Sequence, residues 1–159
     1  MDTIAELVEG LQNKDNLIAY DCLKQLQGMS AESNVVYPYF DTFAEMLQSE
    51  HSYIRTRGML LIAANAEWDM DNKIDEIIDE YLKRLEDSNP ITVRQCIQSL
   101  PQIARFKPDL AQDIVAALRG TNTFRYKSTM QPLIRQDIAN TLQNILEGEP
   151  ESVPVQVKS

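Results

Sequence analysis

Several residue types are scarce in this chain of 159 residues, and each scarcity excludes a class of protein. There are five glycines and no extended run in which Val, Ile and Thr alternate with polar residues, which favours helices over a sheet. The longest apolar run, residues 59–64, has six residues, whereas a membrane span needs roughly 18. The first residues are acidic and lack the basic-then-apolar order of a signal peptide. We therefore expect a cytoplasmic protein that does not enter a membrane.

Side chains that carry much of enzyme chemistry are also scarce. The single histidine, His51, has no surrounding pattern for Ser-His-Asp chemistry, and one histidine with two separated cysteines cannot complete a zinc shell. The stretch from Asp69 to Glu80 resembles a calcium loop only superficially, because Lys73 and Ile74 stand where the loop needs an oxygen ligand and a glycine. A glycine-rich phosphate loop is missing as well. We expect no catalytic site, no metal and no cofactor.

Charge is unevenly distributed along the chain, whose formal net charge is −9. Residues 1–50 carry nine acids and two bases, whereas residues 101–159 carry six acids and seven bases. Within residues 105–135, six bases stand against two acids. Net acidity disfavours general nucleic-acid binding, because the neutralisation of phosphates dominates that affinity. The basic end would instead suit an acidic segment of a partner, and the acidic half a basic one.

One local pattern occurs four times, each time in an apolar helical segment that follows another predicted helix. The aligned positions Ala19, Arg55, Arg94 and Arg135 are 36, 39 and 41 residues apart. A unit of about 40 residues made of two helices is typical of a helical solenoid. The pattern predicts an all-α domain over residues 1–147. Residues 148–159 contain two prolines and no periodicity, which predicts a flexible tail.

Helix-start signals agree with the repeat. Ser52 is expected to cap the fourth helix, and Asn89 with Pro90 begins the sixth. We expect the second helix to run to about Gly28, and the seventh helix to direct its apolar residues inward, namely Leu110, Ile114, Val115 and Leu118. Pro101 falls inside that sixth helix and removes the hydrogen bond to the Ile97 carbonyl, so we expect a bend there. The two cysteines lie on the second helices of the first and third repeats, and we expect both to be free and buried.

The repeated pattern, Ile or Val followed by Arg and then by small or apolar residues, resembles the HEAT repeat family within the armadillo-type (ARM-like) solenoids, over about residues 3–147. The resemblance implies a right-handed α-α superhelix of about four HEAT-like helix pairs. It also implies that Arg55, Arg94 and Arg135 bond to an acid or a carbonyl of an adjacent repeat, the alternative being that they reach the concave face. Arg57 lies outside the repeated position and is expected to be exposed. The closest matches are Ile54-Arg55 with Gly58 and Leu61, and Val93-Arg94 with Ile97 and Leu100.

The fourth repeat carries an insertion, residues 120–129, with two aromatic and two basic side chains. Insertions in repeat proteins lie in loops, often at the binding face. We expect a binding loop, and the alternative is a plug at the end of the stack. Trp68, the only tryptophan, is either an exposed interface anchor or packed over the junction of repeats two and three. The candidate partner-binding residues are Arg57, Trp68, Arg94, Arg105, Phe124, Arg125, Tyr126 and Lys127.

These observations predict a non-enzymatic scaffold or adaptor that binds a protein or peptide on the concave face of a short solenoid. Two alternatives stay open. One is a nucleic-acid-binding relative of the HEAT-like DNA glycosylases, which could recruit Asp137 and Trp68 beside the bases of the second half. The other is a structural subunit whose end repeats stack on another copy or on a larger assembly. The sequence leaves the oligomeric state open.

Overall fold

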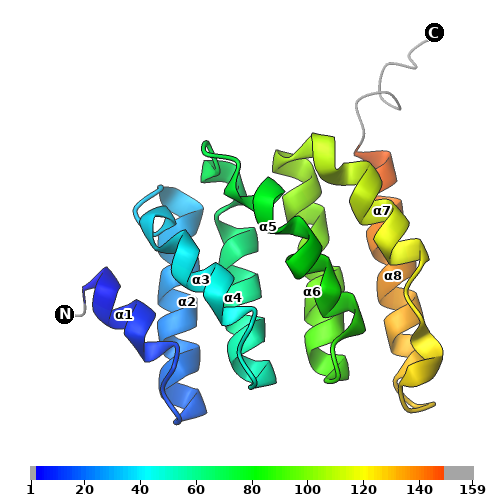
Figure 1. The fold of residues 1–159 in the computed structure, drawn as a ribbon, viewed down its shortest axis with the longest axis horizontal. Coiled ribbons are helices and arrows are strands. Elements are labelled where there is room, and N and C mark those ends of the chain that lie inside the picture. The colour runs from blue at the N-terminus through cyan, green and yellow to red at the C-terminus, as the bar shows by residue number, and fades with distance from the viewer. Residues whose placement is uncertain (1–2, 149–159) are drawn as a thin grey trace, which may run out of the picture. The chain divides into compact units, whose positions relative to one another are not determined.

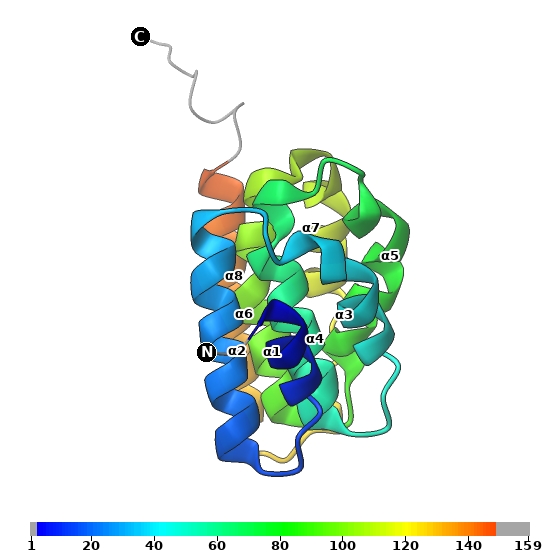
Figure 2. The same cartoon turned by 90° about the vertical axis from the view of Figure 1, so that its left-hand side faces the viewer.

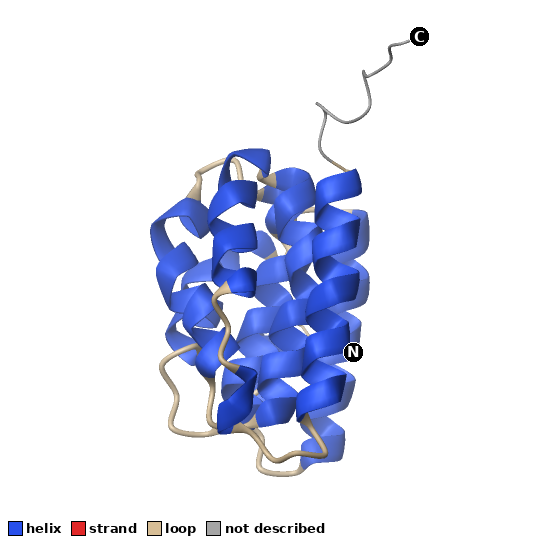
Figure 3. Cartoon of the chain, turned by 90° about the vertical axis from the view of Figure 1, so that its right-hand side faces the viewer, coloured by secondary structure: helices blue, strands red, loops and turns tan. Residues whose placement is uncertain are grey.

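The computed structural model describes residues 3–148 of the chain (Figure 1). The predicted all-α class is confirmed, because residues 3–148 contain eight α-helices, five short 3-10 helices and no strand (Figure 3). The predicted tail lies, from residue 149 onward, outside the described residues. Within the described part of the chain, no helix combines the length and the apolar character that a membrane crossing requires. The α-helices are α1 (Ile4–Gly10), α2 (Asn16–Glu32), α3 (Phe40–Met46), α4 (Ser52–Ala64), α5 (Lys73–Leu82), α6 (Pro90–Phe106), α7 (Ala111–Arg119) and α8 (Gln131–Glu147).

The helices fall into two compact units, Met1–Tyr81 and Leu82–Ser159. Each unit has its own buried apolar core. The 3-10 helices are η1 (Tyr37–Tyr39) and η2 (Ala66–Trp68) in the first unit, and η3 (Lys83–Glu86), η4 (Pro108–Leu110) and η5 (Thr123–Arg125) in the second.

In the first unit, α1 packs on α2, α3 packs on α4, and α2 also contacts α4 (Figure 2). The α3–α4 pair is close because Gly58 has no side chain: a Cβ there would lie 2.7 Å from the Phe43 carbonyl oxygen. Helix starts follow from the capping residues. Thr3 and Glu6 form a capping box on α1, and Asp15 accepts a hydrogen bond at the start of α2.

Two predicted helix limits in the first unit are wrong. The N-cap of α4 is His51, whose extended backbone precedes the helix, and Ser52 is already the first helical residue. The second helix continues past Gly28 to Glu32, because no glycine in the described residues takes the left-handed conformation that would end a helix. Ser30, in this extra turn, is buried and donates to the Leu26 carbonyl.

In the second unit, α6 packs on α8, and α7 contacts both. Asn89 caps α6 and Pro90 is its first residue, as predicted. The predicted inward face of the seventh helix is confirmed, since Ile114, Val115 and Leu118 of α7 are buried, as is Leu110 at the end of η4. Two side-chain contacts fix the register of α6 against α8: Arg94 meets Asp137, and the Thr141 hydroxyl donates to the Ile97 carbonyl. The later residue of α6 contacts the later residue of α8, so the two helices run parallel and begin at the same end of the unit.

Candidate partner-binding surface

The eight residues predicted to bind a partner are divided between the two units. Arg57 and Trp68 belong to the first unit, whereas the other six belong to the second.

Arg57 is buried, so its predicted exposure is wrong. Its side chain is 7% exposed. Its Nη1 donates to the Leu11 carbonyl at 2.8 Å, and its Nη2 donates to Asn16 Oδ1 at 3.1 Å. The guanidinium also lies over the Tyr53 ring, and burial lowers the pKa of Arg57. Leu11 is the C-cap of α1, where carbonyls lack helical partners and a cation is favourable, so Arg57 serves the fold.

Trp68 is half-buried in η2 and its ring nitrogen is occupied. The Nε1 donates to the Ser30 carbonyl at 2.7 Å, and Asn65 Nδ2 donates to Ser30 Oγ at 3.1 Å. These bonds join the last turn of α2 to the segment that follows α4. Trp68 is therefore bonded to the last turn of α2, whereas the sequence suggested either an exposed side chain or one packed over the junction of repeats two and three.

Arg94 makes a two-point contact with a carboxylate on the neighbouring second helix. Its Nε donates to Asp137 Oδ2 at 2.6 Å and its Nη2 donates to Oδ1 at 3.3 Å. The hydrogen bond to Asp137 raises the pKa of Arg94. This is the structural role that the resemblance implies for the repeated arginine. The pairing also occupies the carboxylate of Asp137, which a glycosylase-like site would recruit.

The other two repeated arginines have different partners. Arg55 Nη1 donates to the Ser49 carbonyl at 2.9 Å, in the loop that leads into its own helix. Arg135 is exposed, and its Nη1 donates to Thr123 Oγ1 at 3.2 Å and to Gln131 Oε1 at 3.4 Å. Since both oxygens are neutral, the charge of Arg135 is not balanced by these two contacts.

The inserted segment 120–129 is held by Tyr126. This side chain is 8% exposed, and its hydroxyl donates to the Asp87 carbonyl at 2.7 Å. Burial raises the pKa of the Tyr126 hydroxyl above its ordinary value. Gln131 Nε2 donates to the Tyr126 carbonyl, and Asn122 Oδ1 accepts from the Phe124 amide at the start of η5. Tyr126 is thus an anchor of the insertion, and little of its side chain is left exposed for the partner contact predicted from the sequence.

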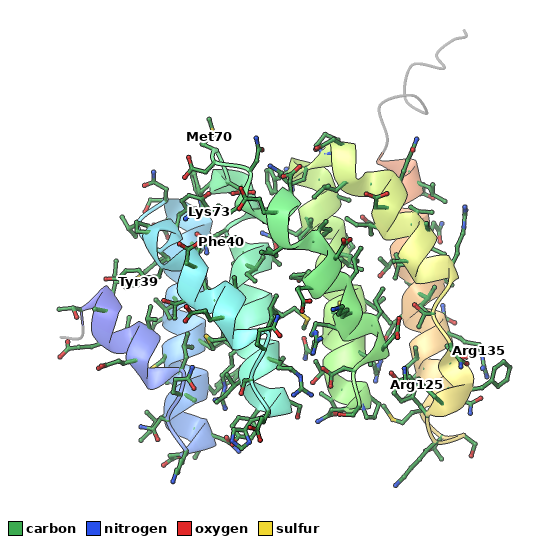
Figure 4. The ribbon with its side chains drawn as sticks, viewed as in Figure 1. Tyr39, Phe40, Met70, Lys73, Arg125 and Arg135 are labelled. Atoms are coloured by element: carbon green, nitrogen blue, oxygen red, sulfur yellow. The ribbon has the colours of Figure 1, made fainter. Side chains whose placement is uncertain are left out.

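The same anchoring leaves Phe124 projecting from η5, with 80% of its side chain exposed. Arg125 and Lys127 on either side of the anchor are exposed, and Arg125 reaches Glu86 Oε1 only at 3.9 Å. Arg125 and Arg135 lie at the end of the unit where α8 begins (Figure 4). The residues that share this end are Ile91, Phe124, Arg125, Lys127, Leu133 and Arg135, which we call the η5 surface.

Two apolar residues complete the η5 surface. Ile91 and Leu133 lie in the first turns of the parallel helices α6 and α8 and are 55% and 43% exposed. Sequence reasoning missed both residues. Both are apolar side chains in the first turn of a helix, at positions outside its buried stripe, and this feature could have identified them from the sequence. Leu17 in α2 and Tyr53 in α4 share the same feature.

Arg105 does not belong to the η5 surface. It lies near the C-terminal end of α6, fourteen residues after Ile91, which corresponds to about 21 Å along the helix. Its guanidinium lies 5.1 Å from the centroid of the neighbouring Phe106 ring. Arg105 is therefore a suitable control for charge changes at the η5 surface.

The η5 surface can bind anions and apolar groups, and none of its six residues is an acid, a histidine or a cysteine. The exposed carboxylate of Glu86 lies beside it, 3.9 Å from Arg125. Within residues 3–148, no three His, Cys, Asp or Glu side chains are grouped so that they could hold a metal ion. Comparison of the chain with protein-family models, with curated proteins and with solved structures gave no match.

Proposed function

We propose that this chain is a non-enzymatic, cytoplasmic protein-binding module of four HEAT-like helix pairs, and that it engages its partner at the η5 surface. The observation that carries the proposal is the contrast between two neighbouring aromatic residues. Tyr126 is buried and bonded to the Asp87 carbonyl, whereas Phe124, two residues earlier, is 80% exposed. A large aromatic side chain on an anchored loop, next to arginines, is the composition of interaction hot spots.

The anchoring matters for affinity as well as for position. Ordering a loop or a long side chain on binding costs free energy, roughly 0.5–1.5 kcal/mol for each immobilised side chain. The hydrogen bonds of Tyr126, Asn122 and Gln131 order the inserted segment before any partner arrives. Phe124 is thereby presented at a low entropic cost. An insertion that only plugged the end of the stack would direct this ring inward.

The resemblance to HEAT repeats also supports the η5 surface as the binding site. In such solenoids the second helices of the repeats line the concave face, and the η5 surface includes the first turns of two second helices, α6 and α8. The partner would then meet the rim of that face. Arg94, in its ion pair with Asp137, would hold the two helices in register and would not itself contact the partner.

Affinity capture from a lysate of the native host tests the proposal, with nuclease-treated and untreated samples compared. The variants are F124S and R125E/K127E, and the control is R105E, which reverses a single charge away from the η5 surface. All four positions are exposed, so each variant should keep its stability within about 0.5 kcal/mol. We expect protein partners that survive nuclease, are lost with both surface variants and are kept by R105E.

Three results would contradict the proposal. Capture that disappears with nuclease would indicate nucleic-acid binding. Partners that F124S and R125E/K127E retain as well as the wild type would show that the η5 surface is not the binding site. Self-association that F124S abolishes would indicate the structural-subunit alternative.

A further inference from the structure

The charge of the chain changes at the boundary between its two units. Residues 1–81 carry sixteen acids and five bases, a balance of −11, whereas residues 82–159 carry eight acids and ten bases, a balance of +2. Three of those ten bases belong to the η5 surface. Among residues 3–148, its one ionic contact joins Arg125 to Glu86 at 3.9 Å, and the Glu86 side chain is 72% exposed. A long contact between exposed groups contributes little, so the surface keeps most of its positive charge available.

The arginines of the η5 surface also have N–H donors that the contacts described above do not use. A guanidinium has five N–H donors in a planar fork that matches a carboxylate. Arg135 uses Nη1 on the neutral oxygens of Thr123 and Gln131, which holds the side chain in place without neutralising it. Arg125 lies 5.8 Å from the centroid of the Tyr126 ring, so the anchor of the insertion also supports this guanidinium. Both arginines are therefore positioned in advance for an anionic group.

Apolar side chains flank these bases. Phe124, Ile91 and Leu133 together offer exposed aromatic and aliphatic surface at the starts of α6 and α8. Burying such surface is favourable by about 25 cal/mol per Å². A ligand that satisfies the whole η5 surface needs both carboxylates and at least one apolar side chain.

Resting on the proposed function, we infer that the partner offers an extended acidic peptide: a short segment with two or three Asp or Glu side chains and one aromatic or large aliphatic residue. The carboxylates bind Arg125, Lys127 and Arg135, and the apolar residue packs on Phe124. The number of charges in such a segment matches the three bases. This complementarity assigns to the surface a class of ligand that the binding proposal alone leaves unspecified.

A nucleic acid fits the same surface less well. Its affinity comes chiefly from the number of phosphates neutralised, and three bases release few counterions. The chain as a whole carries a net charge of −9, which repels an extended polyanion. A short peptide has limited charge and also supplies the apolar side chain that Phe124 requires.

A random library of displayed peptides, each about twelve residues long, tests the inference on the full chain. Enriched peptides are then synthesised, and their affinities are measured by fluorescence anisotropy for the wild type and for F124S, R125E/K127E, R135Q and R105E. We expect the enriched peptides to be acidic and to contain an aromatic or large aliphatic residue. Their affinity should fall by roughly tenfold or more with R125E/K127E and F124S and should change less than about twofold with R105E. Replacement of their Asp and Glu residues by Lys should restore binding to R125E/K127E.

The other outcomes separate the inference from the proposed function. Neutral or basic peptides that bind the wild type and are lost with F124S would leave the binding function standing and overturn the acidic ligand. Enriched peptides whose affinity no surface variant changes would overturn both. Both the acidic ligand and the binding function would also be overturned if no peptide is enriched and capture from the lysate fails. A single-stranded DNA of the same length that binds more tightly than every peptide, and is lost with R125E/K127E, would replace the peptide by nucleic acid.

Discussion

Arg57 is a buried charged residue whose hydrogen bonds all lie within the first unit. Its guanidinium supplies donors to the C-cap carbonyl of α1 and to the side chain of Asn16, the first residue of α2. The carbonyl of Leu11 has no helical partner, and an unpaired buried acceptor costs about 1–3 kcal/mol. Arg57 thus joins α4 to the connection between α1 and α2.

We expect R57A to lower the free energy of unfolding of the first unit by about 2–3 kcal/mol, because it removes a charged donor from buried acceptors. Urea unfolding followed by tryptophan fluorescence measures this, since Trp68 is the only tryptophan and lies in the first unit. The control is K14A, which removes an exposed base of the same unit and should change stability by less than about 0.5 kcal/mol. An R57A variant as stable as K14A would contradict the role assigned to these hydrogen bonds.

At the scale of helices, α6 contains an internal proline, and a side chain of α8 replaces the hydrogen bond that this proline removes. Pro101 has no N–H, so the Ile97 carbonyl loses its usual partner four residues later. The Thr141 hydroxyl donates to that carbonyl at 3.2 Å, in a buried position between the two helices. The gap in the hydrogen bonding of α6 is therefore filled by a side chain of α8.

A double-mutant cycle tests this compensation. We expect T141V, which keeps the side-chain volume, to destabilise the second unit by about 1–3 kcal/mol, because the Ile97 carbonyl becomes an unpaired buried acceptor. In the P101A background, Ala supplies the missing N–H, so T141V should cost about 1 kcal/mol less. Hydrogen–deuterium exchange of the α6 and α8 amides measures both free energies. Equal costs in the two backgrounds would mean that Thr141 does not compensate for Pro101.

The same elements show how far sequence reasoning reaches. The position of Pro101 and the carbonyl it frees were predictable, because both depend on spacing within one helix. The donor from Thr141 was not, because it lies 44 residues away and depends on the register between α6 and α8. The insertion was located by the repeat length, but its segment has no helical period. Which of Phe124 and Tyr126 faces inward therefore follows only from the position of the Asp87 carbonyl.

At the scale of the whole molecule, each unit has its own core and one cysteine. Cys22 is buried in the first unit, packed where Gly10 leaves space for its sulfur, and Cys96 is buried in the second. Neither forms a disulfide bond, as predicted. Burial raises the pKa of the Cys96 thiol, which disfavours the reactive thiolate. A thiol reagent should therefore reach each cysteine mainly when its own unit opens.

This arrangement predicts that the two cysteines report separately on the two units. We expect R57A to accelerate alkylation of Cys22 by iodoacetamide roughly thirtyfold, the factor that corresponds to about 2 kcal/mol, and to leave Cys96 unchanged. T141V should accelerate alkylation of Cys96 and leave that of Cys22 unchanged. Mass spectrometry of the labelled peptides measures both rates in the same sample. If either variant accelerates both cysteines equally, the chain opens as one cooperative body. In that case, a variant that weakens the first unit would also disturb the η5 surface. Separate rates would instead mean that the first unit can lose stability without disturbing the ordered insertion on which partner binding depends.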